Sequence, residues 1–274
     1  MKGDLHIHSV YSDGSFTPLE IAQTAKENGL QVFSITDHDG TGNVQEKINS
    51  AKSVGLNYIK GIELSTFNGA EQVHILGYGY DENNNSFLKI LKNLDEKRTE
   101  RTEIMLKRLK QYYNIEIAFK EVENTSTESV GSMHIARAMI KKGYVKSVKE
   151  AFGNYIGQGQ KAYCSEKRQT PKEAIETVLC AGGIPVLAHP GKLTAKGDDQ
   201  IKLIENIVKD GLAGIEAHYS SHTRNQTEYY INLAKSYKLI ITGGSDFHGM
   251  GREERIGLPV NDFDSELLKI LKMC

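Results

Sequence analysis

The chain has 274 residues, of which 39% are hydrophobic and 25% are charged, and its formal net charge at pH 7 is −1. This length suits one large α/β domain, or one domain with an inserted subdomain, and the composition is that of a globular protein with a sizeable core. A net charge near zero provides no global basic field, so any contact with nucleic acid must be local.

The cysteines and the N-terminus place further limits on the class of protein. Cys164, Cys180 and Cys274 are widely spaced and form no CxxC pair, which argues against a disulfide framework and against a cysteine zinc site. The first residues lack the apolar stretch of a signal peptide. The sequence also has no run of about 18 apolar residues, so no membrane span is expected. We therefore expect a cytoplasmic enzyme without membrane association.

The first part of the chain alternates between expected strands and helices. The pattern predicts strands at 4–8, 31–36, 57–64 and 73–80, and helices at about 17–29 and 44–54. Thr17 is the expected N-cap of the first helix, with Pro18 at its first position and Glu20 closing a capping box. This alternation favours a mostly parallel sheet or barrel.

The alternation stops in the middle of the chain. A highly charged helical stretch runs from about 86 to 113, and its opposite charges at short spacing suit a solvent-exposed helix. Shorter helical pieces with glycine-rich connections follow. We expect an inserted, mostly helical cap at 99–168, between a first barrel part at 1–98 and a second at 169–274.

The alternation resumes at Thr170, which with Glu173 forms a second expected capping box. The remaining pattern predicts strands at 184–188, 213–217 and 239–242, and helices at about 170–182, 199–210, 223–237 and 264–272.

Polar side chains gather at the expected strand ends. His6 and His8 are two residues apart on the first strand and so point to the same face, which fits either metal ligation or two half-buried neighbours. Other polar groups close later apolar strands: Asp37 with His38, Glu63, His189, His218, and Asp246 with His248. Because the carboxyl ends of parallel strands meet at one face, we expect these groups to converge there.

The residue types point to a metal centre. The candidate ligands are His6, His8, Asp13, His38, Glu63, His74, His189, Asp246 and His248. Histidine and carboxylate without cysteine favour zinc, manganese or iron. At about four to six ligands per ion, some of them shared, this set predicts two or three divalent ions. A carboxylate such as Glu63 can bridge two of them.

Six motifs carry a resemblance to a known family: DLHIHS at 4–9, YSDG at 11–14, TDHD at 36–39, GIE at 61–63, AHPG at 188–191 and GSDFHG at 244–249. In this combination and order they resemble the PHP (polymerase and histidinol phosphatase) family. The resemblance implies a distorted (β/α)7 barrel with an inserted helical cap and a trinuclear metal centre.

The resemblance also implies how the ligands divide. One ion would be held by His6, His8, Glu63 and Asp246, a second by Glu63, His74 and His189, and a third by Asp13, His38 and His248. Many relatives have histidine at the position of Asp13, and a carboxylate there resembles the branch of 3′,5′-nucleoside bisphosphate phosphatases and 5′-to-3′ exoribonucleases. The segment 131–137 resembles the cap of that branch, apart from Met133, where proline is usual.

Roles beyond metal ligation follow from position. His134 and Arg137 lie three residues apart and share a helix face, which fits either an ordinary exposed face or binding of a second phosphate, and the resemblance favours phosphate binding. His222 follows a strand end, where it can contact phosphate or protonate the leaving group. Asp37 is expected either to orient a ligating imidazole or to cap the next helix. His218 is expected to be a packed, hydrogen-bonded residue.

The expected function is a metal-dependent phosphoesterase that uses a metal-activated hydroxide, with Asp246 and His248 in the catalytic centre. The resemblance favours nucleoside 3′,5′-bisphosphates or short RNA 5′ ends as substrates, and the same-chemistry alternative is histidinol phosphate. A non-catalytic metal-binding PHP module is the alternative of another class. No obligate protein partner is inferred.

Overall fold

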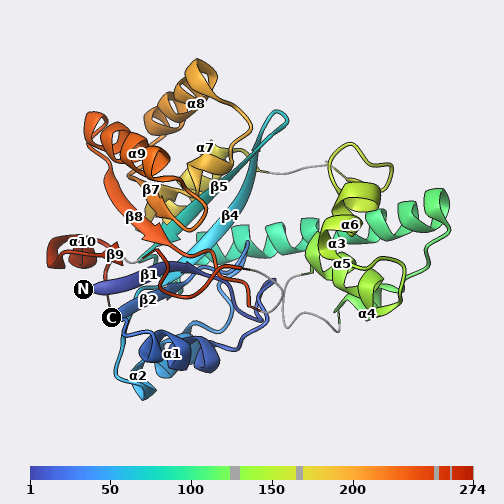
Figure 1. Cartoon of the computed structure of the whole chain (residues 1–274), viewed down its shortest axis with the longest axis horizontal. Helices are drawn as coiled ribbons and strands as arrows, with labels where there is room; N and C mark the ends of the chain where they lie inside the picture. The colour runs from blue at the N-terminus through green and yellow to red at the C-terminus, as the bar shows by residue number, and fades with distance from the viewer. Residues whose placement is uncertain (124–129, 165–168, 250–252, 260, 274) are drawn as a thin grey trace.

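The computed structural model describes residues 1–123, 130–164, 169–249, 253–259 and 261–273 (Figure 1). Cys164 and Cys180 are free thiols, as expected, and Cys274 lies outside the described residues, as do parts of the expected cap. None of the described helices combines the length and the apolar character needed to cross a membrane.

The described strands form two sheets. The first has the order β3-β2-β1-β9 and the second the order β4-β5-β6-β7-β8. The strands are β1 (Lys2–Ile7), β2 (Val32–Ile35), β3 (Asn57–Tyr58), β4 (Gly61–Asn68), β5 (Glu71–Tyr78), β6 (Ile184–Leu187), β7 (Gly214–Tyr219), β8 (Ile240–Gly244) and β9 (Asn261–Asp262). Both sheets are mixed, because β4–β5, β5–β6 and β1–β9 pair antiparallel whereas the other neighbours are parallel.

The closed (β/α)7 barrel implied by the resemblance is not formed by the described strands. The two sheets meet at two seams through single parallel bridges, Ile7 with Phe247 and His38 with Glu63. Pairing at each seam is limited to one bridge because the chain turns away from the strand direction just beyond it. Asp39 and Asp246 have positive φ values of 55° and 57°, a conformation that ends regular pairing.

One seam depends on a close approach between β1 and the end of β8. A Cβ added to Gly244 would lie 2.3 Å from Cβ of His6, so a side chain at this position would separate the two strands. The buried Asp4 carboxylate accepts hydrogen bonds from the backbone N–H groups of Ser245 (2.9 Å) and Gly257 (2.7 Å). The strand β1 is therefore held beside the end of β8, as metal ligation by residues from both ends of the chain requires.

The prediction of one strand at 57–64 is wrong, because this segment contains β3 and the start of β4. β3 pairs with β2 in the first sheet, and β4 begins the second sheet. The chain passes from one sheet to the other at 59–60, a step that an uninterrupted apolar pattern does not reveal. The hairpin β4–β5 then makes the second sheet mixed, where a mostly parallel sheet was expected.

The helices largely follow the sequence pattern. They are α1 (Pro18–Glu27), α2 (Val44–Ser53), α3 (Asn85–Tyr113), α4 (Phe119–Glu123), α5 (Ser132–Lys141), α6 (Val148–Ala151), α7 (Pro171–Cys180), α8 (Gly197–Lys209), α9 (Arg224–Ser236) and α10 (Ser265–Ile270), with a π-helix η1 (Phe152–Ile156) and a 3₁₀ turn η2 (Pro190–Lys192). Both expected capping boxes are confirmed, at Thr17 with Glu20 and at Thr170 with Glu173.

The long helix α3 runs from the second sheet to the short helices α4, α5 and α6 (Figure 1), and it contributes side chains to two separate hydrophobic cores. Its first turns bury Phe87 and Leu91 against the second sheet and α7. Its later turns bury Met105 and Leu109 in the core of α4, α5, α6 and η1, which we call the cap. The expectation of a solvent-exposed helix therefore holds for only part of its surface, and α3 fixes the cap relative to the sheets.

Candidate metal centre

The structure brings all nine candidate ligands into one buried region where the two sheets meet. His6 lies on β1 and His8 just beyond it, and the turn that follows carries Asp13. The segments after β2, β6 and β8 supply His38, His189, Asp246 and His248. Glu63 and His74 lie inside β4 and β5, so for Glu63 the expected strand-end position is wrong. The pair β4–β5 places both side chains at the seam.

Glu63 lies at the centre of this region. Its Oε1 is 2.8 Å from Nδ1 of His74 and 3.0 Å from Nε2 of His189. Its Oε2 is 3.1 Å from Nε2 of His8 and 3.1 Å from Nδ1 of His38. The two oxygens therefore face two different sets of imidazoles, which is the geometry expected of a bridging carboxylate.

The two carboxylate oxygens of Asp246 also contact different groups. Oδ1 lies 3.4 Å from Nε2 of His6 and 3.2 Å from Nε2 of His8. Oδ2 accepts hydrogen bonds from the Tyr219 hydroxyl (2.8 Å) and from the Lys192 ammonium (2.7 Å). One oxygen is thus anchored, and the other is directed at the imidazole pair. The contribution of Tyr219 and Lys192 was not visible in the sequence.

Asp13 faces a third set of groups. Its Oδ1 is 3.2 Å from Nε2 of His248, 3.7 Å from Nδ1 of His8 and 4.0 Å from Nε2 of His38. The Asp13 backbone carbonyl accepts a hydrogen bond of 2.6 Å from Nη2 of Arg137. Arg137 therefore contacts the ligand-bearing turn.

These contacts define three groups whose ligand atoms lie within 4.8 Å of one another: His6, His8, Glu63 and Asp246; His38, Glu63 and His74; and His8, Asp13, His38 and His248. They resemble the expected division of ligands, with two differences: His38 takes the place of His189 in the second group, and His8 joins the third group. His189 still contacts Glu63 directly.

The residues present fit divalent ions. Buried ring or carboxylate atoms of His8, Asp13, His38 and Glu63 have no hydrogen-bond partner in the described structure, and such atoms are costly to bury unless something binds them. Nitrogen and carboxylate oxygen donors, without thiolate, suit zinc, manganese or iron.

The carboxylates of the centre are held in their anionic form. Burial by itself raises the pKa of a carboxyl group, but nearby imidazoles lower the pKa of Asp13 and Glu63 well below the usual value. For Asp246 the opposing charges are the Lys192 ammonium and the adjacent imidazoles, which again lower its pKa well below the usual value. Three buried negative charges in one region favour the binding of cations.

The imidazoles divide into two classes. Burial lowers the pKa of His38 to about 3 and that of His189 to about 4, so both rings are neutral at pH 7 and can act as ligands. For His8, burial is outweighed by the adjacent carboxylates of Asp246 and Glu63, which raise its pKa to about 9. An ion that binds His8 must therefore displace a proton.

Asp37 has neither of the roles expected from the sequence. Its carboxylate accepts hydrogen bonds from the backbone N–H of Ser9 (2.8 Å) and the hydroxyl of Ser12 (2.8 Å), and pairs with buried Lys47 at 2.6 Å. The N-cap of the next helix is Asn43. Asp37 fixes the turn that delivers Asp13 instead of orienting a ligating imidazole.

Both ring nitrogens of His222 are bound to backbone groups, and its expected role in catalysis or phosphate binding stays a prediction. Its Nδ1 donates to the Ala217 carbonyl (2.9 Å), and its Nε2 accepts from the Gly191 N–H (3.1 Å). With both ring nitrogens bound to backbone, this histidine fastens the turn after His189 to the end of β7. His218 is partly buried on β7 and packs against Gly243, outside the ligand groups.

Two adjoining cavities border the candidate centre. The metal pocket, about 410 Å³, is lined by eight polar groups and by Lys192 and Leu193. The cap pocket, about 250 Å³, lies between the sheets and the cap and shares Asp13, His38, Gln72 and His74 with it. A ligand can therefore occupy both cavities at once.

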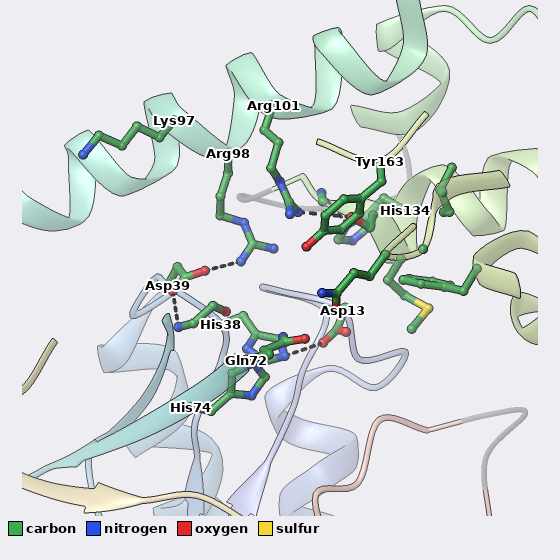
Figure 2. A pocket seen from close by; sticks show the side chains of 18 of the residues that line it. Asp13, His38, Asp39, Gln72, His74, Lys97, Arg98, Arg101, His134 and Tyr163 are labelled. Atoms are coloured by element: carbon green, nitrogen blue, oxygen red, sulfur yellow. Dashed lines mark hydrogen bonds and ion pairs between the residues drawn. The ribbon is translucent and has the colours of Figure 1, made fainter. Parts of the chain in front are cut away.

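The wall of the cap pocket is cationic. Arg98 and Arg101 extend into the cavity from α3 (Figure 2), and Lys97 lines it as well. Arg98 pairs with Asp39, whereas Nη2 of Arg101 donates to the hydroxyl of Ser132 at 3.1 Å. Burial and the adjacent Arg98 lower the pKa of Arg101. The sequence did not indicate that these arginines line a cavity, because the charge pattern of the helix is equally typical of a solvent-exposed face.

The expected phosphate-binding pair is only partly placed in this cavity. His134 lines the cap pocket and is fully buried, whereas Arg137 is directed to the Asp13 backbone. Burial lowers the pKa of His134 to about 4, so it faces the pocket as a neutral ring and not as a cation. The cationic contribution comes from α3.

Comparison with known proteins gives the family. The model of the PHP domain matches residues 4–179, and the chain belongs to this family. It is 32% identical to a 5′-3′ exoribonuclease from Haemophilus influenzae over 247 residues, covering 90% of each chain. It is also 32% identical to a 3′,5′-nucleoside bisphosphate phosphatase from Chromobacterium violaceum over 258 residues, covering 92% of this chain and 89% of that one.

A solved structure supports the same relationship. A protein from Bifidobacterium adolescentis, described as a candidate metal-dependent phosphoesterase, superposes with a TM-score of 0.88 and 29% sequence identity. The match covers 98% of this chain and 95% of that one. The two-sheet arrangement and the cap therefore recur together in a relative.

Proposed function

We propose that this protein is a metal-dependent phosphoesterase that removes a phosphate from a nucleoside 3′,5′-bisphosphate or from a short RNA 5′ end. Eight of the nine candidate ligands would hold two or three divalent ions, in the three groups that share Glu63, His8 and His38, and His189 lies beside Glu63. Bound there, such ions supply Lewis acidity, which lowers the pKa of water and neutralises phosphoryl oxygens.

The residues of the chain have distinct tasks in this reaction. Glu63 holds neighbouring ligand groups together through its two oxygens. Tyr219 and Lys192 fix Asp246 so that one carboxylate oxygen remains directed at His6 and His8. Lys192 also lines the metal pocket, where its positive charge favours an anionic substrate.

The observation that carries the choice of substrate is the cationic wall beside the metal pocket. A substrate with two phosphates can place one at the candidate metal centre and the other near Arg98 and Arg101. Guanidinium groups bind phosphate through charge-assisted hydrogen bonds. Histidinol phosphate has a cationic amine instead of a second phosphate, so the same wall would repel it.

The test is phosphate release with Mn²⁺, measured on adenosine 3′,5′-bisphosphate, histidinol phosphate and a short 5′-phosphorylated RNA. We expect release from the bisphosphate or the RNA, loss of activity in EDTA, and loss in His8→Ala and Asp246→Asn. Equal release by wild type and both variants would contradict the assignment. Faster release from histidinol phosphate would favour the alternative substrate, and ion binding without release from any substrate would favour a non-catalytic module.

A further inference from the structure

Glu216 is a buried carboxylate that lies outside the nine candidate ligands. It is on β7, and its residue is 0% exposed. Among the described residues, its ion pair is with His6, and no lysine or arginine pairs with it. A buried charge of this kind is costly unless it makes specific hydrogen bonds.

The two oxygens of Glu216 contact two different ligand residues. Oε1 lies 2.9 Å from Nδ1 of His6, and Oε2 accepts the backbone N–H of His189 at 2.7 Å. A carboxylate can only accept, so Nδ1 of His6 carries a proton, and Nε2, which lies 3.4 Å from carboxylate oxygens of both Glu63 and Asp246, is the ring atom left to bind an ion.

The hydrogen bond from His189 to Glu216 restrains the backbone of His189. His189 has φ of 27°, an unfavourable backbone conformation for a residue with a side chain, and such residues persist only where the surroundings hold them. The hydrogen bond from its N–H to Glu216 is one such restraint. It keeps Nε2 of His189 at 3.0 Å from Oε1 of Glu63.

We infer that Glu216 is a positioning residue that couples two parts of the metal centre. Through one oxygen it sets the tautomer of His6, and through the other it sets the backbone of His189. The group of His8, Asp13, His38 and His248 includes neither of these residues. Loss of Glu216 therefore weakens ion binding around Glu63 and leaves the Asp13 group intact. This inference rests on the metal centre of the proposed function.

The sharpest substitution is Glu216→Gln, which keeps the shape and removes the charge. The glutamine amide can donate to Nδ1 of His6, which favours the opposite tautomer with the proton on Nε2 and removes the lone pair from the metal-facing side. Glu216→Asp keeps the charge but shortens the reach, and it is the second variant if Glu216→Gln does not fold. The matched control is Glu176→Gln, an exposed carboxylate on α7.

The experiment measures Mn²⁺ binding to EDTA-treated full-length protein, by the electron paramagnetic resonance signal of free Mn²⁺. Circular dichroism and thermal unfolding in EDTA check the fold, and ¹⁵N NMR reports the His6 tautomer. We expect wild type and Glu176→Gln to bind alike. In Glu216→Gln, affinity at the sites around Glu63 falls about 10- to 100-fold, the size of effect typical for groups that orient a metal ligand, and the remaining site is unchanged.

Two results overturn the inference, and they are distinguishable from each other. A folded Glu216→Gln or Glu216→Asp variant that binds every ion with wild-type affinity and keeps the proton on Nδ1 of His6 refutes the role of Glu216 alone. A wild-type protein that binds no Mn²⁺, Zn²⁺ or Fe²⁺ refutes the metal centre, and the coupling with it. A uniform loss at all sites also refutes the coupling, because it indicates a general disruption of the fold.

Discussion

Arg101 provides the sharpest test of how the substrate is chosen. It reaches into the cap pocket from α3, next to Arg98, and it donates a hydrogen bond to a neutral hydroxyl, that of Ser132. Arg98 in contrast is already paired with Asp39. If the second phosphate of a nucleoside bisphosphate binds at this wall, Arg101→Gln removes one charge-assisted contact to it.

The size of the effect follows from that contact. A hydrogen bond to a charged group contributes about 1.5–3 kcal/mol. At 1.36 kcal/mol for each factor of ten, this corresponds to a fall in kcat/KM of roughly 10- to 150-fold. The fall is expected only for substrates with the second phosphate, because a monophosphate makes no contact with this wall.

The assay compares kcat/KM for adenosine 3′,5′-bisphosphate with that for the two adenosine monophosphates. The matched control is Lys107→Gln, which removes a positive charge from a largely exposed side chain of the same helix. We expect Arg101→Gln to lose its preference for the bisphosphate, and Lys107→Gln to keep it. An equal loss on all three substrates, or no loss on any, refutes the assignment of the second phosphate to this wall.

Three further predictions concern metal content, stability and pH. Asp246→Asn is expected to lose bound metal as well as activity, since its Oδ1 faces the imidazole pair, and elemental analysis after gel filtration checks this. Lys47→Met leaves the buried Asp37 carboxylate without its cationic partner, so it is expected to lower the free energy of unfolding by about 3–5 kcal/mol in urea titrations. The control Lys52→Met, on the same helix, should change the free energy of unfolding little. The pKa of His134 is about 4 in the folded protein and near 6.5 when unfolded, so the unfolded state takes up its proton first. Its contribution to stability is therefore present above pH 6.5 and is lost as the pH falls toward 4, by at most about 3 kcal/mol. A His134→Gln variant whose stability falls as steeply as that of wild type between pH 6.5 and pH 4 would contradict this.

The elements that depend on local chemistry could be predicted from the sequence. Thr17 and Thr170 cap their helices because the hydroxyl, the following proline and the glutamate at the third helical position act within a few residues. The candidate ligands could be found in the same way, since they stand in short motifs beside apolar strands. Such signals need no knowledge of where distant segments lie.

The sequence could not predict features that depend on contacts between distant segments of the chain. It could not separate β3 from β4, because the change of sheet partner leaves no mark in the apolar pattern. It could not show that both ring nitrogens of His222 are bound to backbone groups. It also read α3 as a solvated helix, because opposite charges at short spacing look the same whether they face water or a cavity.

By itself, the sequence determined the chemical character of the centre: imidazoles and carboxylates without thiolates, in short motifs on or beside apolar strands. Only the tertiary structure decided which groups support them. Glu216, Lys192 and Arg101 have no motif, and each acts through a contact with a residue at least 27 positions away. Their roles depend on distance and burial, which arise only when the sheets and the cap are packed together.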